Sequence, residues 1–408
     1  IGKYPMECIN ILNKLIRHAI ENVDFGALEN RDAKLISYLD KSNYLSSLSY
    51  FSLVKPHGGA LINRMVYIRP SANYLESLPK LQISESQQMD VEQIGIGTFS
   101  PLEGFMGERD FHSVLDNLRL ANGLIWPLPI VLDIDQEQAD KLITGTDIGL
   151  TDDRKRVVAI LHLEEKYGFD KKKLALKLYG TENNEHPGVK MVTEMKPVLI
   201  SGKIDLLKRK ETETKEYDLT PCQVRKLFDE RGWSKVVGFH TRNVIHRGHE
   251  FIQMKALADE NCDGLFIHPV IGRKKIGDFS PKYIIQSYEI MMKNFYPKDK
   301  VVFSTFSTFS KLIGPREALF TAICRKNFGC SHFIVGRDHT GVGDFYSSEA
   351  SQKIFDNFPD LGIKAITFGN VFYSEKLQRY VHERDNPDHD PEDKFHISGT
   401  KAREALKN

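Results

Sequence analysis

The strongest constraint on the fold is an alternation of short apolar runs and helical patterns between residues 235 and 368. The apolar runs include "KVVGF" (235–239) and "HFIVG" (332–336). They alternate with stretches of roughly 10 to 15 residues that have helical periodicity. This alternation is typical of a parallel sheet covered by helices on both faces. The sequence therefore predicts an α/β fold here, with a ligand site at the carboxyl ends of the strands. Further strands are expected in 264–270, 300–306 and 363–368, and a helix in "SEASQKIFDNF" (348–358).

The preceding part of the chain has a different texture, which predicts a separate domain. From about residue 46 to 205, β-like runs such as "WPLPIVLDI" are broken by Gly, Pro and Asn, as in a mainly β, barrel-like domain. The charged stretch "KRKETETKEY" (208–217) lacks apolar periodicity and is interpreted as a linker. We expect a helical extension over 1–45, a mainly β domain with its linker over 46–217, and the α/β domain over 218–408.

Composition narrows the class of protein. Fifty-six basic and 55 acidic residues leave a net charge of +1, so no overall field attracts nucleic acid or anionic membranes. No apolar run approaches the roughly 18 residues of a membrane-spanning helix, and we expect a cytoplasmic protein. The five cysteines are scattered without CxxC spacing, which favours buried thiols over a disulfide framework or a zinc site.

Two of the expected strands end in unusually polar sequence. One runs into "HTRNVIHRGHE" (240–250) and the other into "RDHTGVG" (337–343). His246 and His249 stand three residues apart where a helix should begin, beside unpaired backbone amides and the positive end of the helix dipole. This arrangement suits a polyphosphate. A zinc role is disfavoured because no third ligand follows at useful spacing.

Several long motifs resemble those of the ATP sulfurylase (sulfate adenylyltransferase) family. "GFHTRNVIHRGHE" is similar to the QxRNPxHxxH signature, and "GPREALFTAICRKNFGCSHFIVGRDHTGVG" is similar to a second block of that family. Further matches are "LVKPHGGALINR", "GTFSPLEGFM", "HPGV", "HPVIGRKKIGD" and "ISGTKARE", so the resemblance spans roughly residues 50 to 405. Separately, "GKYPMECI" near the N-terminus resembles a short segment of pyruvate kinases.

The resemblance implies a PUA-like N-terminal domain followed by a Rossmann-like nucleotidyltransferase domain of the HxGH kind. Such enzymes convert ATP and sulfate to adenosine 5'-phosphosulfate and pyrophosphate, the first step of sulfate activation, with Mg2+ accompanying ATP. A homodimer or larger homo-oligomer is expected, without nucleic acid or membrane partners. No GxxxxGK[ST] loop of an APS kinase follows, so a stand-alone sulfurylase is expected.

The resemblance also implies roles for individual residues. Arg242 would bind sulfate and direct it at the α-phosphorus, with Thr241 and Asn243 on phosphate oxygens. His246 and His249 would stabilise the departing pyrophosphate, and Arg337 would add positive charge in the transition state. The expected sulfate contacts also include His240 and Thr340, and the expected ATP contacts are His240, Thr241, Arg242, Asn243, Gly336, Arg337, Asp338, His339 and Val371.

Three positions depart from the family pattern on the sulfate side. His240 stands where most members have Gln, Val244 where they have Pro, and Thr340 where they have Ala. These changes leave two other functions open: a weakened nucleotide- or oxyanion-binding regulator, and an adenylyltransferase for another oxyanion such as selenate or molybdate. Residues 373–396 lack the metal-holding cysteines of some members and are expected to form a solvated loop over the active site.

Overall fold

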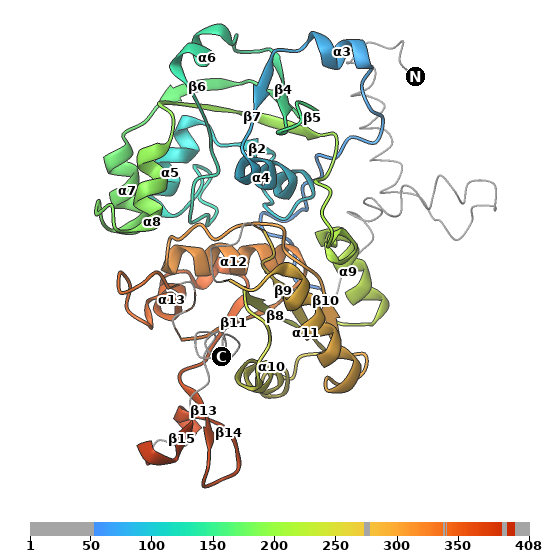
Figure 1. Cartoon of the computed structure of the whole chain (residues 1–408), viewed down its shortest axis with the longest axis vertical. Coiled ribbons are helices and arrows are strands. Elements are labelled where there is room, and N and C mark those ends of the chain that lie inside the picture. The colour runs from blue at the N-terminus through green and yellow to red at the C-terminus, as the bar shows by residue number, and fades with distance from the viewer. Residues whose placement is uncertain (1–52, 273–277, 338, 340, 386–389, 396–408) are drawn as a thin grey trace, which may run out of the picture. The chain divides into compact units, whose positions relative to one another are not determined.

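The computed structural model describes residues 53–272, 278–337, 339, 341–385 and 390–395 (Figure 1). The expected N-terminal helical extension, with its pyruvate kinase-like segment, lies outside these residues. The chain divides into two compact units. The first unit is Ile1–Thr212, Thr220–Glu230 and Asn327–Gly329, and the second is Glu213–Leu219, Arg231–Lys326 and Cys330–Asn408. None of the described helices is long and apolar enough to cross a membrane.

The first unit is built around a mixed seven-stranded sheet, as expected for a β-sheet domain, and it also contains more helix than the sequence predicted. Its long strand β7 pairs antiparallel with β2, β3, β5 and β6, and all its residues except Lys203 are buried. The strands are β1 (Lys80–Gln82), β2 (Gly104–Phe105), β3 (Leu132–Ile134), β4 (Asp147–Thr151), β5 (Val157–His162), β6 (Glu165–Gly168) and β7 (Val198–Leu206). The helices are α3 (Ala72–Ser77), α4 (Glu85–Gly95), α5 (Glu108–Asn117), α6 (Gln136–Lys141), α7 (Lys171–Tyr179), α8 (Pro187–Glu194) and α9 (Pro221–Glu230).

The stretch interpreted as a linker is anchored at its start. Arg209 Nε lies 2.8 Å from a carboxylate oxygen of Glu92, and the backbone amide of Lys210 donates to the other oxygen at 2.6 Å. Glu92 is buried in α4, so its charge requires these partners. A 3-10 helix, η2 (Lys215–Tyr217), follows in the second unit. The attraction between Arg209 and Glu92 explains why this part of the chain is fixed. A search for hydrophobic periodicity does not detect such a contact.

The second unit contains the predicted parallel sheet. Its order is β10-β9-β8-β11-β12, and every neighbouring pair is parallel. The strands are β8 (Val236–Thr241), β9 (Gly264–Pro269), β10 (Val301–Phe303), β11 (His332–Val335) and β12 (Lys364–Thr367). The helices are α10 (Arg247–Asp259), α11 (Pro281–Asn294), α12 (Pro315–Asn327) and the short α13 (Ala350–Lys353). All six residues of β9 are buried, as expected for a strand covered on both faces.

Side-chain alternation assigns the helices to the faces of this sheet. Val237 and Phe239 of β8 belong to one core cluster with residues of α10 and α11. Gly238, between them, faces Arg325 of α12 on the opposite side. From β8 the chain adds β9 and β10 on one side and then β11 and β12 on the other. The order therefore reverses between β8 and β11, which is the point where open α/β sheets bind ligands.

Two expectations for the C-terminal part of the chain are wrong. The helix expected over 348–358 is only α13 followed by two 3-10 helices, η3 (Ile354–Asn357) and η4 (Pro359–Leu361). The described residues within 373–396 are not an open loop, because alternating apolar and polar residues at 371–374, 379–382 and 394–395 form antiparallel strands (Figure 1). The elements there are β13 (Val371–Ser374), β14 (Arg379–His382), η5 (Glu383–Asp385), η6 (Pro391–Asp393) and β15 (Lys394–Phe395).

Candidate active site

The two polar segments predicted to form a site follow neighbouring strands. β8 ends at Thr241 and β11 ends at Val335, and the two strands are hydrogen-bonded in parallel register. The ring of His240, in β8, lies 5.5 Å from the ring of His339, beyond β11. The segments therefore converge at the carboxyl edge of the sheet, as the sequence predicted.

His246 and His249 form a stacked pair at the start of α10. Their ring centroids are 3.8 Å apart with an interplanar angle of 24°. His246 is the N-cap residue, whose carbonyl accepts from the amides of His249 (2.9 Å) and Glu250 (3.1 Å), while its side chain caps nothing. Phe239 supports the pair, since its ring centroid lies 5.4 Å from that of His249. The backbone amides of Arg247 and Gly248 have no hydrogen-bond partner within the described residues, so two imidazoles and two free amides share this end of the helix.

Burial keeps these histidines neutral. It lowers the pKa of His246 to about 4 and lowers the pKa of His249 well below its usual value, with the neighbouring His246 as a further cause. The pKa of His240 is likewise well below its usual range because of burial and the nearby charge of Arg325. The Nδ1 atoms of all three are buried and have no hydrogen-bond partner within the described part of the chain. Each neutral ring can donate one N–H to an anion.

The segment between β8 and α10 supplies the other predicted contacts. The hydroxyl of Thr241, which is buried, accepts from the backbone amide of Asn243 at 3.2 Å and so fixes the turn. Arg242, between them, is exposed, and Asn243 is half-buried. An exposed guanidinium at a strand end can form paired hydrogen bonds to a tetrahedral oxyanion.

The second segment is described only in part. Gly336 is half-buried and Arg337 exposed, directly beyond β11, and His339 has its pKa lowered to about 4 by burial. Val371, at the start of β13, packs partly buried against the core cluster of this unit. Asp338 and Thr340 lie outside the described residues, so their predicted roles rest on the sequence alone.

Two neighbours of this site were not singled out by the sequence. His268 of β9 pairs in register with His240 of β8, and Arg325 of α12 donates to the carbonyl oxygen of His268 at 2.7 Å. A signal for His268 was present, because "VVGFHT" and "GLFIHP" both carry His at their fifth position. Arg325 lies in a helix distant in sequence, and only the tertiary structure brings it to the strand ends.

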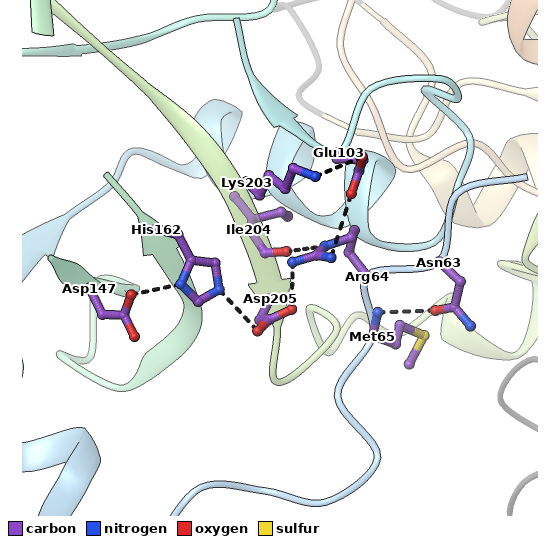
Figure 2. Close-up of polar contacts among 9 residues, drawn as sticks. All are labelled: Asn63, Arg64, Met65, Glu103, Asp147, His162, Lys203, Ile204 and Asp205. Carbon is purple, nitrogen blue, oxygen red and sulfur yellow. Dashed lines mark hydrogen bonds and ion pairs between the residues drawn. The ribbon is translucent and has the colours of Figure 1, made fainter. Parts of the chain in front are cut away.

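The first unit holds another dense polar cluster, drawn in Figure 2. His162 bridges two carboxylates, with Nδ1 2.6 Å from Asp147 and Nε2 3.1 Å from Asp205. Arg64 pairs with Asp205 at 2.9 Å and lies 3.6 Å from Glu103, which Lys203 also contacts at 3.1 Å. Hydrogen bonds to Asp147 and Asp205 raise the pKa of His162 to about 9. Opposite charges are matched here, so the cluster is a closed structural network.

A parallel Rossmann-like sheet with histidines and arginines gathered at its switch point, in a chain that also carries a second sheet-based unit, has the architecture of an α/β nucleotidyltransferase. Sequence profiles agree: one for ATP-sulfurylase matches residues 215–408 and one for a PUA-like domain matches residues 54–209. The sulfate adenylyltransferase of Halothermothrix orenii is 42% identical over 362 residues, which cover 87% of this chain and 94% of that protein. The chain belongs to the ATP-sulfurylase family.

Other relatives agree with this assignment. The sulfate adenylyltransferase of Acaryochloris marina is 43% identical, with 87% of this chain and 92% of that protein covered. That of Staphylothermus marinus is 44% identical, with 86% and 92% covered. Among solved structures, a hexameric APS kinase from Thiobacillus denitrificans gives a TM-score of 0.65 at 22% identity. The match covers 87% of this chain and 64% of that one, and at this identity it supports the fold alone.

Proposed function

We propose that this enzyme is a sulfate adenylyltransferase, which joins ATP and sulfate to give adenosine 5'-phosphosulfate and pyrophosphate, reversibly. The convergence of His240 and His339 at the switch point, beside the stacked His246 and His249, carries the proposal. It is supported by relatives of that name at 42 to 44% identity over most of the chain. The expected division into a PUA-like part (46–217) and a catalytic part (218–408) is supported by the profile matches. It is also supported by the second unit, which contains both polar segments that follow β8 and β11.

The reaction requires positioning and charge stabilisation. A sulfate oxygen forms a bond to the α-phosphorus while the bond from that phosphorus to the bridging oxygen breaks, and the electron pair leaves with pyrophosphate. No proton has to move, so neutral imidazoles suffice as hydrogen-bond donors. In this proposal Arg242 and Arg337 orient sulfate and stabilise charge at the α-phosphoryl group, as groups prepared for a transition state do.

The remaining contacts follow from position along the two segments. His246, His249 and the first amides of α10 would hold the β and γ phosphates, since a helix N-terminus favours anions. Thr241 and Asn243 would hold phosphate oxygens, and His240 and Thr340 would contact sulfate. Because His240 is neutral, it replaces the family's Gln with one N–H donor and no charge. Gly336, Asp338, His339 and Val371 would line the nucleotide.

We propose that Mg2+ enters with ATP, as phosphate-bound Mg2+ commonly does. The described residues contain no group of three or more His, Cys, Asp or Glu that could hold a metal ion by themselves. When bound, Mg2+ neutralises charge on the phosphates. ATP use also supports a cytoplasmic location, and the family resemblance supports a homodimer, which light scattering in solution would test.

The test is ATP–pyrophosphate exchange with sulfate and Mg2+ added or omitted. Exchange should require both, and Arg242→Ala should lower it at least a thousandfold, because several charge-assisted hydrogen bonds of about 1.5 to 3 kcal/mol each are lost. Arg231→Ala is the matched control: it removes an exposed arginine before the amino end of β8 and should leave exchange within about twofold.

The same assay separates the alternatives. Exchange without sulfate would contradict the proposal, and ATP binding without turnover at saturating sulfate would identify the weakened regulator. Replacing sulfate by selenate or molybdate tests the other acceptors. With molybdate, the reaction is followed by release of pyrophosphate and AMP, because the mixed anhydride hydrolyses. A higher kcat/KM with either anion than with sulfate would reassign the substrate.

A further inference from the structure

Arg325 is a buried cation without a counter-ion among the described residues. Its exposed fraction is 0%, and among the described residues its side chain donates only to backbone carbonyls, those of His268 at 2.7 Å and Thr321 at 3.4 Å. Its buried Nε has no hydrogen-bond partner in the described part of the chain. Burial lowers the pKa of the group only to about 10, so it remains charged. A buried charge that lacks a carboxylate is costly and points to a role outside packing.

The guanidinium lies immediately behind the proposed anion site. A Cβ added to Gly238 would lie 2.9 Å from Cγ of Arg325, so glycine makes room for the arginine stem on this face of β8. His240 is two residues further along the same face. His268, whose carbonyl receives the hydrogen bond from Arg325, is the register partner of His240. Arg325 is therefore level with the last residues of β8 and β9.

Aromatic contacts hold this arrangement in place. The Cζ atom of Arg325 lies 4.8 Å from the ring centroid of Phe306, and the ring of His268 stacks on Phe306 at 5.0 Å and 21°. Nε2 of His268 lies 3.1 Å from the carbonyl oxygen of Thr305. The guanidinium is thus fixed by a ring and by backbone carbonyls, which leaves its positive charge unneutralised.

The same charge adds to the effect of burial, which keeps the neighbouring imidazoles neutral. After burial, Arg325 is the largest cause of the lowered pKa of His240, His268 and His339. The groups facing His240 are Arg325 from α12, His268 from β9, His339 beyond β11 and Arg242 on its own segment. The positive charge behind the strand ends is therefore the permanent charge of Arg325, while the imidazoles around it stay uncharged.

We propose that Arg325 is a positioning residue for the anionic acceptor: it supplies a fixed positive charge behind the carboxyl ends of β8 and β9, and the bound sulfate serves as its counter-ion. The inference deepens the proposed function and rests on it. In a partly buried site, a unit charge roughly 8 Å from an anion changes its affinity by about tenfold to a hundredfold. The effect should fall on sulfate more than on the chemical step.

The principal test compares Arg325→Met with Arg225→Met. Arg225 is an equally buried arginine of α9 in the first unit, where it donates to the carbonyl oxygens of Asn327 and Val54, each at 3.0 Å. Arg325→Met should raise the KM for sulfate at least tenfold while kcat changes less than about threefold. Arg225→Met should lower thermal stability and leave the sulfate KM unchanged.

A second readout needs no turnover. In Arg325→Met, protein labelled at its histidines should show imidazoles of the group His240, His268 and His339 titrating at higher pH than in the wild type, because a repelling charge is gone. Arg225→Met should leave these titrations unchanged. If the wild type shows no sulfate-dependent exchange, the proposed function fails, and the histidine titrations still decide whether Arg325 sets the charge at the strand ends.

Arg325→Lys distinguishes charge from shape, because it keeps the charge and loses the planar fork. It should hold the sulfate KM within about threefold of the wild type and keep the imidazoles neutral. Should Arg325→Met fail to fold, the Nε–H resonance of Arg325 in the wild type should still shift when inorganic sulfate is added with a non-hydrolysable ATP analogue. Unchanged histidine titrations in Arg325→Met, or a sulfate KM equal to that of Arg225→Met, would overturn the inference, as would an unshifted resonance.

Discussion

The two units use histidine in opposite ways. In the first unit His162 lies between Asp147 and Asp205, carries a proton and completes a network in which each charge has a partner. In the second unit His246 and His249 stack on each other, neutral, and their Nδ1 atoms have no partner within the described residues. A matched network stabilises a fold, whereas polar groups buried without partners mark a candidate ligand site.

The largest expected contrast is in activity. His249→Ala should lower sulfate-dependent exchange about a hundredfold, because a donor prepared for phosphate is lost. His162→Ala should leave the exchange rate within about twofold. Steady-state kinetics on both variants check this contrast, and comparable losses of kcat would show that the network of the first unit also takes part in the reaction.

Stability should show the reverse contrast. His162→Ala leaves Asp147 and Asp205 without their bridge, and we expect the free energy of unfolding of the first unit to fall by about 2 kcal/mol, since the ring is 27% exposed and partly screened. The two tryptophans report separately, Trp126 on the first unit and Trp233 on the second. Denaturant unfolding in a Trp233→Phe background measures the effect, and an unchanged midpoint would contradict it.

The pH dependence of stability should have opposite signs in the two units. The pKa of His162 is raised from about 6.5 to about 9, so its contribution is complete below pH 6.5 and is lost as the pH rises through 9. Trp126 fluorescence should therefore show the first unit weakening between these values. His162→Gln should flatten this slope, and a slope that persists in the variant would assign it to other groups.

In the second unit the relevant window is acidic. The pKa of His246 is lowered to about 4, so the unfolded chain binds a proton between pH 6.5 and 4 that the folded chain does not. Stability reported by Trp233, in a Trp126→Phe background, should fall as the pH falls through this window. His246→Gln should reduce that fall by no more than about 1.4 kcal/mol per pH unit, whereas identical curves would contradict the assignment.

The smallest expected effect comes from Tyr74, whose hydroxyl donates to Asp147 at 2.5 Å. Burial alone would raise the pKa of Asp147, but hydrogen bonds from His162 and Tyr74 lower it. Tyr74→Phe should cost the first unit about 1 kcal/mol, the typical value of one such bond. A change below the measurement error would show that His162 alone holds this carboxylate.

Sequence reasoning predicted the parallel sheet and the convergence of the two polar segments at its carboxyl edge, because apolar runs and polar strand ends are local patterns. It did not predict the antiparallel strands β13, β14 and β15, whose polar composition conceals their alternation. Nor did it single out Arg325 or His268. The position of His268 depends on the register of β9 against β8, and that of Arg325 depends on how α12 packs against the sheet. The network around His162 joins residues far apart in sequence, from Arg64 to Asp205, and has no local signature.

The composition of the first unit has a consequence for the order of synthesis. Arg225 in α9 donates to the carbonyl oxygen of Asn327, and both residues belong to the first unit although most of the second unit lies between them in the chain. Once β7 has been translated, all seven strands of this sheet exist. The hydrogen bond between Arg225 and Asn327 cannot form until Asn327 has been translated as well. The N-terminal unit therefore remains unfinished until most of the catalytic sheet has been translated.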